Sequence, residues 1–162
     1  MRTARFAALA LLTALVVVPY ALAESQTVQG TGAIKKLTAN NGDNKVVAKL
    51  KGMDAPCEAH YFKVVIFWGK KKAYQADAGC YGTEWIPSLY YQANRNSGQG
   101  GKEVKCDKFK VAYDKDLGGY KVVVPRKCMD EAPDKIKVRA EGDNYGSPMP
   151  GEAGPTKALA RG

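Results

Sequence analysis

The chain has 162 residues, with 25 Lys and Arg against 16 Asp and Glu, one His and four Cys, and 45% of its residues are hydrophobic. This composition excludes a polytopic membrane protein, a collagen-like chain and a wholly disordered chain, and the length suits one domain with short appendages. A single His also excludes a metal site that is built from several histidine ligands.

Residues 1–23 have the three parts of a secretory signal peptide. Two arginines precede an apolar run from Phe6 to Val18, and Ala21-Leu22-Ala23 matches the small-x-small pattern that signal peptidase accepts. The apolar run is shorter than the ~20 residues that a membrane-spanning helix needs. We therefore predict a secreted, extracellular protein whose mature chain begins at Glu24 and has no membrane span after cleavage.

The mature chain contains turn signals and short β-type runs, and no stretch has a sustained helical period. Residues 24–32 are polar, and we expect a flexible N-terminal segment there. The run 61–68 is β-branched and aromatic nearly throughout, which predicts a strand that is buried on both faces. From 142 to 162 Gly and Pro dominate, and we expect a mobile C-terminal tail. The expected strands are 33–38, 46–50, 61–68, 73–76, 83–92, 104–113, 120–125 and 135–140.

Short strands at intervals of about ten residues predict an all-β domain over residues 33–141. We expect an antiparallel β-sandwich of about seven to nine strands, and a β-barrel is the alternative. In the last strand, Ile136 and Val138 should face the core.

The four cysteines, Cys57, Cys80, Cys106 and Cys128, all lie in the mature chain. In an oxidising compartment an even number of cysteines predicts disulfides, here two. The spacing favours Cys57–Cys80 and Cys106–Cys128, because each pair would close a hairpin. Since none of the four forms a CxxC pair, a zinc site is disfavoured.

Alternation of apolar residues predicts the register of the last hairpin. Pairing Tyr113 with Tyr120, and Val111 with Val122, brings Cys106 within one residue of facing Cys128. A bulge at Pro125, which cannot donate to a ladder, would supply that one residue.

The mature chain is strongly basic, and its basic residues are mostly lysines. Removal of residues 1–23 takes two Arg from the 25 basic residues and leaves 23 against 16 acidic ones, a net charge of +7. Nineteen of the 23 are Lys. Because bidentate recognition of phosphate and guanine favours Arg, this charge indicates attraction to anionic polymers and no specific nucleic-acid recognition.

Two groups of residues are candidate ligand surfaces. A lysine run at a predicted hairpin tip could contact an anionic polymer, or could be a solvated turn that discourages edge pairing. An aromatic group that also includes Tyr81 could stack on sugar rings or pack in the core. The candidate surface consists of Lys70, Lys71, Lys72, Trp85, Tyr90 and Tyr91.

No catalytic constellation is visible in the sequence. His60 is the only imidazole, and a general base needs a nucleophile near it in space. Asp114-x-Asp116-x-Gly118 begins like a calcium loop, but Gly118 and Pro125 stand where further ligands are needed. We predict no catalytic residues, no metal site and no cofactor.

The C-terminal half carries a further pattern of three parts. It begins with the run Val122-Val123-Val124-Pro125-Arg126-Lys127-Cys128 and continues after a short loop with Lys135-Ile136-Lys137-Val138-Arg139. The last three residues are Ala160-Arg161-Gly162. This layout resembles small secreted proteins of actinobacteria, in which a strand ends in Val-Pro-Arg-x-Cys and a final strand follows a short loop. The resemblance implies export and a disulfide-bearing β-sandwich. It implies no activity, site or cofactor.

The function predicted from these features is that of a secreted, non-enzymatic protein that binds an anionic or carbohydrate polymer of the cell envelope or the extracellular space. One alternative is a small basic secreted hydrolase, a nuclease or muramidase, that uses His60 or a pair of carboxylates. Another is a secreted protease inhibitor that presents the segment 81–105 between two disulfides.

Overall fold

The computed structural model describes residues 23–53, 60–81, 84–96, 100–144 and 147–162. These residues form an antiparallel all-β structure with one short 3-10 helix, η1 (Arg126–Cys128). Within the same ranges, no helix has the length and apolar character needed to cross a membrane. The strands are β1 (Glu24–Thr31), β2 (Lys36–Asn41), β3 (Lys45–Lys51), β4 (His60–Trp68), β5 (Lys72–Tyr81), β6 (Glu84–Gln92), β7 (Lys102–Glu103), β8 (Lys110–Asp114), β9 (Gly119–Pro125), β10 (Lys137–Asn144) and β11 (Ser147–Ala153).

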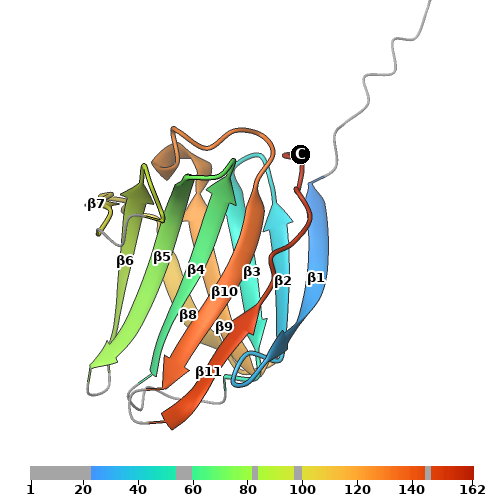
Figure 1. The fold of residues 1–162 in the computed structure, drawn as a ribbon, viewed down its shortest axis with the longest axis vertical. Helices are drawn as coiled ribbons and strands as arrows, with labels where there is room; N and C mark the ends of the chain where they lie inside the picture. The colour runs from blue at the N-terminus through green and yellow to red at the C-terminus, as the bar shows by residue number, and fades with distance from the viewer. Residues whose placement is uncertain (1–22, 54–59, 82–83, 97–99, 145–146) are drawn as a thin grey trace, which may run out of the picture.

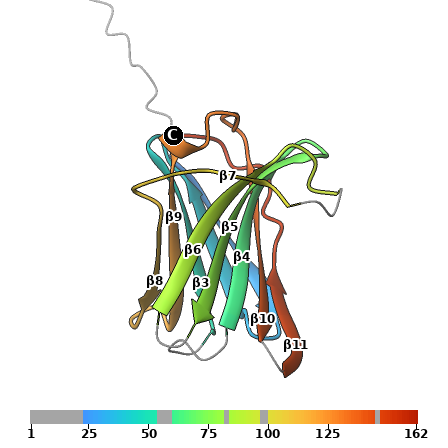
Figure 2. The ribbon, with the colours of Figure 1, turned by 90° about the vertical axis from the view of Figure 1, so that its left-hand side faces the viewer.

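The described strands form one sheet with the order β7-β6-β5-β4-β10-β11-β1-β2-β3-β9-β8. The sheet curls into a half-barrel, so that β4, β5 and β10 lie in front of β3, β8 and β9 (Figure 1), and Figure 2 shows the same curl from the side. The expected all-β antiparallel fold is confirmed. Instead of the expected sandwich of about seven to nine strands in two sheets, the described residues form one sheet of eleven strands. The reason is β1, which pairs along β2 and also pairs with β11 at Gly30 and Thr31.

Gly30 allows this junction, because a Cβ atom there would lie 2.1 Å from the Ile34 carbonyl oxygen. The core lies between the two halves of the curled sheet. Phe62 of β4 meets Tyr120 of β9 with ring centroids 5.0 Å apart, and both side chains are fully buried. Ile136 and Val138 also face this core, as expected. We call the sides of the sheet turned away from the core its outer faces.

Strand β4 is buried on both faces, as its composition predicts. Phe62, Val64 and Ile66 belong to the main core, whereas Val65 and Phe67 form a second cluster with Ala73 on the outer face. This apolar cluster on the outer face is covered by the side chain of Arg95, which lies over the Phe67 ring.

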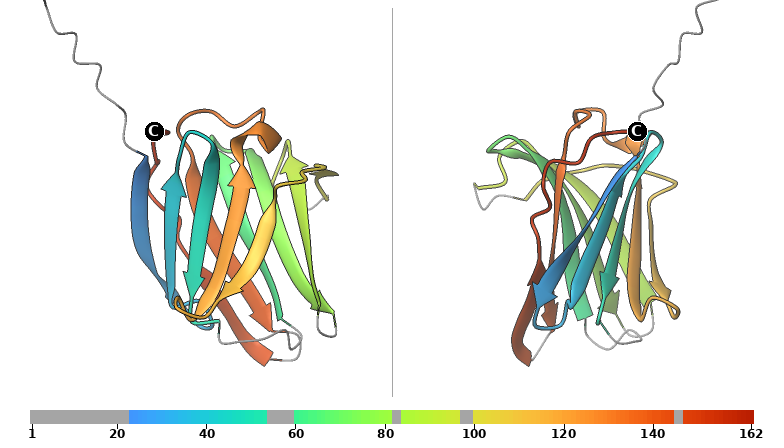
Figure 3. Two further views of the ribbon diagram at one scale, coloured as in Figure 1. Left: turned by 180° about the vertical axis from the view of Figure 1, so that it is seen from behind. Right: turned by 90° about the vertical axis from the view of Figure 1, so that its right-hand side faces the viewer.

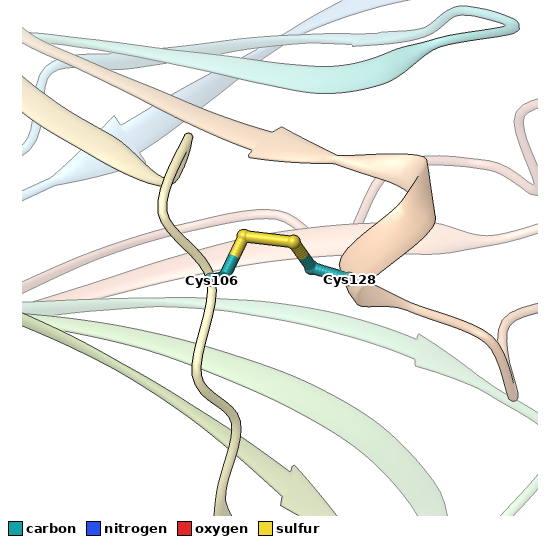
Figure 4. The surroundings of a disulfide bond; sticks show 2 residues. All are labelled: Cys106 and Cys128. Carbon is teal, nitrogen blue, oxygen red and sulfur yellow. A yellow bond between two sulfur atoms is a disulfide. The ribbon is translucent and has the colours of Figure 1, made fainter.

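The predicted register of the last hairpin is confirmed, since Val111 pairs with Val122 and Tyr113 with Tyr120. The disulfide Cys106–Cys128 is also present, with Cα atoms 5.8 Å apart (Figure 4). The bulge expected at Pro125 is wrong, because β9 ends there and η1 carries Cys128 to Cys106.

Other cysteine and leader predictions fall on residues outside the described ranges. Cys57 is one of these residues, so the Cys57–Cys80 pairing stays a prediction. Residues 1–22 are also outside them, and the signal peptide stays a prediction as well.

Both terminal segments that the sequence predicts as flexible, 24–32 and 142–162, contribute strands to the sheet. The first is β1, which pairs with β2 from Glu24 to Gln29. In the second, β11 pairs with β10, and Leu159 is buried and bridged to Ile136. Gly151 allows close packing there, because a Cβ atom would lie 2.6 Å from the Ile34 nitrogen.

A buried polar network ties the C-terminal segment to one end of the half-barrel. The Asn41 amide donates to the carbonyls of Asp134 and Leu159, at 2.8 Å each, and its oxygen accepts from Arg126. The Arg126 guanidinium also donates to the Pro133 carbonyl at 3.1 Å. Burial lowers the pKa of Arg126, so this cation depends on its hydrogen bonds for stabilisation.

Candidate ligand-binding groove

The lysine run lies at the turn between β4 and β5, and its three members have different surroundings. Lys72 forms an ion pair with Glu131 at 3.1 Å, and this hydrogen bond raises the pKa of Lys72. Lys71 is exposed. Lys70 is exposed too, and its carbonyl accepts from the Arg95 Nε at 3.4 Å. The turn therefore holds Arg95 in place as well as carrying charge.

The aromatic candidates do not share one face of the sheet. Tyr90 and Tyr91 are successive residues of β6, and successive side chains of a strand point to opposite sides. Tyr91 packs against Tyr74 on the core side, with ring centroids 5.2 Å apart. Trp85 pairs with Cys80 in the ladder, and its side chain lies outside the description.

His60 is the first residue of β4 and pairs with Asn144 in the ladder. Its side chain also lies outside the description, so the catalytic alternative for His60 stays a prediction.

Arg95 covers the apolar cluster on the outer face of β4. Its backbone N–H donates to the Lys71 carbonyl at 2.8 Å, and its guanidinium lies 4.2 Å from the centroid of the Phe67 ring. A cation over an aromatic face is attracted by the ring quadrupole. This contact explains how Phe67 can be 7% exposed on a face that is turned away from the core.

Two hollows flank Arg95 on this outer face, and Arg95 lines both. One has a volume of about 510 Å³ and the other about 290 Å³. No acidic residue lines either hollow, within the part of the chain that the structure describes. We call the two hollows together the basic groove, after the six basic residues that line them: Lys63, Lys70, Arg95, Lys135, Lys137 and Arg139.

Glu141 positions two of these cations. Its carboxylate lies 2.6 Å from Lys63 Nζ and 2.6 Å from an Arg139 nitrogen. Lys63 is its direct cross-strand partner on β4, and Arg139 is two residues away on the same face of β10. One carboxylate shared by two cations leaves this end of the groove positively charged.

Two glutamines add hydrogen-bonding capacity to the smaller hollow. The Gln92 amide donates to the Gln75 side-chain oxygen at 2.8 Å, and the Gln75 amide donates to Asp77 at 3.0 Å. This orientation leaves the side-chain oxygen of Gln92 as an acceptor at the hollow. The groove can therefore donate to an anion and also accept from a hydroxyl.

Asp77 ends this chain of hydrogen bonds on the outer face. Burial raises the pKa of Asp77, although hydrogen bonds from Gln75 and Tyr61 and the charge of Lys63 act in the opposite direction. Burial and the neighbouring Asp77 also raise the pKa of Tyr61. The folded protein thus holds the Asp77 proton more tightly than the unfolded chain does.

Replacement of Asp77 by Asn should change how stability depends on pH. A raised folded-state pKa means that the free energy of unfolding of the wild type falls as pH rises from the ordinary carboxyl range through the raised value. An amide can still accept from Gln75 and does not ionise, so Asp77→Asn should gain stability relative to wild type between about pH 3 and pH 7. Urea unfolding across this pH range measures the difference. Asp116→Asn, at an exposed turn, is the control, and a difference that shrinks with rising pH would contradict the assignment.

The groove residues differ from those that the sequence singled out, with Lys70 as the shared member. A signal for three of them was present in Lys135-Ile136-Lys137-Val138-Arg139, because apolar residues that face inward leave the alternating cations outside. Arg95 carried no such signal, since it lies beyond the end of β6.

Comparisons of this chain with protein-family models, with curated proteins and with solved structures give no match. Across the described residues, no group of three or more His, Cys, Asp or Glu side chains could hold a metal ion.

Proposed function

We propose that this chain is an exported binding protein that holds an anionic polysaccharide of the cell envelope or the extracellular space in its basic groove. The observation that carries the proposal is the set of six cations around two hollows that share Arg95 and that no acidic residue lines. In such a groove, ammonium and guanidinium groups attract carboxylates or other anionic groups.

The polar groups of the groove favour a sugar polymer. Gln92 can accept from a hydroxyl, and Asn96 adds a second amide at the larger hollow. Ligand clefts commonly have volumes of ~300–1,000 Å³, and the two hollows that meet at Arg95 are of this size. A chain of several sugar units could lie across both.

Single-stranded nucleic acid is less well supported, because its binding relies on aromatic side chains that are free to stack on bases. Phe67 and Trp68 line the larger hollow, but Arg95 covers the Phe67 ring and Trp68 stacks on Tyr74. The excess of Lys over Arg in the groove also provides point charges more than bidentate forks.

Export is part of the proposal. It is supported by the signal-like pattern of residues 1–23 and by the start of β1 at Glu24, directly after the predicted cleavage site. The N–H of Glu24 donates to the Ala160 carbonyl at 3.4 Å, so the fold uses the chain from that residue onward.

Binding is tested with protein recovered from the culture medium, whose intact mass should correspond to residues 24–162. We expect retention on immobilised polygalacturonate and none on its fully methyl-esterified form, which keeps the sugars and removes the charge. Arg95→Gln combined with Lys137→Gln, the groove variant, should bind a short oligogalacturonate at least tenfold more weakly by calorimetry, because two charge-assisted contacts are lost.

Lys105→Gln combined with Lys127→Gln is the matched control, since both lysines are exposed and line neither hollow. It removes the same net charge and should change the affinity less than twofold. Equal affinities of the groove variant and this control would refute the proposed site.

A further inference from the structure

The other half of the sheet carries a second basic surface on its outer face. This surface is formed by β2, β3, β8 and β9, which the left panel of Figure 3 shows from outside. Its lysines alternate with the buried residues of each strand, so they point away from the core. We call it the lysine face, and its members are Lys36, Lys45, Lys49, Lys51, Lys110 and Lys121.

The register places lysines directly opposite each other. Lys36 pairs with Lys51, and Lys49 pairs with Lys121. Like charges directly opposite on one face of an antiparallel pair destabilise the sheet. In the described part of the chain, none of the six lysines takes part in an ion pair. A face that keeps such unfavourable pairs is best explained by an anionic ligand that neutralises them.

Polar side chains accompany the lysines. A hollow of about 310 Å³ crosses this face, and Ser25, Thr38 and Asn40 line it beside Lys45, Lys49 and Lys121. Like the basic groove, this hollow places an amide group beside ammonium groups, and it adds two hydroxyls. Both surfaces therefore suit a polymer with anionic groups and hydroxyls.

The two basic surfaces point in opposite directions. The basic groove lies on the outer face of β4 and β10, which face the viewer in Figure 1, whereas β3 and β9 lie behind them. The inner sides of these two halves pack against each other through Phe62 and Tyr120. One polymer chain on the groove and one on the lysine face would be separated by the thickness of the protein.

We infer that the lysine face is a second binding surface for anionic polysaccharide, so that one molecule bridges two polymer chains. The bridging step rests on the proposed function of the groove. Binding by the lysine face does not depend on the groove and can be tested in its absence.

The test of the face combines Lys49→Glu and Lys51→Glu with the groove variant. Position 49 lies opposite Lys121 and position 51 lies opposite Lys36, so each substitution replaces a like-charge pair with a pair of opposite charges. Thermal unfolding should therefore show an unchanged or higher stability. The groove variant alone should retain salt-sensitive binding to immobilised polygalacturonate. Adding the two glutamates should abolish this residual binding. Addition of Lys105→Glu and Lys127→Glu instead should weaken it only slightly. Equal elution of the two combined variants would overturn the inference, whatever the groove itself does.

Bridging is measured by light scattering of soluble polygalacturonate titrated with protein. Wild type should give a scattering maximum that disappears in excess polymer and at high salt. Lys49→Glu with Lys51→Glu should keep the affinity for a short oligogalacturonate and lower the maximum at least fivefold. A maximum equal to that of Lys105→Glu with Lys127→Glu would overturn bridging. An unchanged affinity of the groove variant for the short oligogalacturonate would instead overturn the proposed function.

Discussion

Replacement of Asn41 by Ala is expected to lower the free energy of unfolding by about 3 kcal/mol. Asn41 is fully buried and donates two hydrogen bonds to the carbonyls of Asp134 and Leu159. It also accepts from the buried guanidinium of Arg126. The truncation would leave a cation and two carbonyls without these partners, away from water. Urea unfolding followed by tryptophan fluorescence measures the loss.

The neighbouring Asn40 provides the matched control. It has the same side chain in the same strand, but it lies on the outer face, where water can replace its contacts. Asn40→Ala should change the free energy of unfolding by less than about 0.5 kcal/mol. Similar losses in the two variants would show that the buried network does not hold the C-terminal segment in place.

Removal of the Cys106–Cys128 disulfide, as Cys106→Ala with Cys128→Ala, should cost about 3 kcal/mol. The bond joins residues with a sequence separation of 22, and without it the unfolded chain gains the freedom of that loop. In the folded protein the bond ties the segment between β7 and β8 to η1. Chemical denaturation of the two proteins measures the difference.

The same variant should leave ligand binding intact, because neither cysteine lines the basic groove. Affinity for the short oligogalacturonate should stay within twofold of wild type. A loss of stability below about 1 kcal/mol would contradict the loop-closure account, and a large loss of affinity at full folding would place the disulfide closer to the ligand than the structure does.

The two halves of the half-barrel give the molecule its two basic surfaces. Each strand turns its apolar residues toward one shared core, so its charged residues must lie on an outer face. Because the sheet curls back on itself, these outer faces point in opposite directions. The proposed bridging of two polymer chains follows from this curvature together with the charge.

Local patterns in the sequence were sufficient where a strand alternates apolar and polar residues. The register of Tyr113 with Tyr120 is an example, because only a short turn separates β8 from β9. The inward direction of Ile136 and Val138 is another, and it also determines that the cations between them point outward. In both cases a period of two residues carries the information.

The terminal strands could not be found in this way, although β1 pairs with β2 and β11 pairs with β10, their neighbours in the chain. Polar residues, Gly or Pro interrupt the apolar alternation in both. In β1, the inward positions are occupied by Gln26, Val28 and Gly30, which make no apolar alternation. Its order comes from backbone pairing with β2, and Leu159 is ordered by its bridge to Ile136 and its place in the core. Gly and Pro in the last segment indicated mobility, but Gly151 serves close packing.

The sequence by itself determined the all-β class, the Cys106–Cys128 pairing and the basic character of the surface. Alternation and cysteine spacing are local patterns in the sequence, and net charge follows from the composition. Only the tertiary structure decided that β1 and β11 join the two halves into one sheet, and that Arg95 comes to lie over Phe67 between cations of β4 and β10. Backbone hydrogen bonds and ring contacts between residues far apart in the chain depend on which surfaces the whole fold brings together.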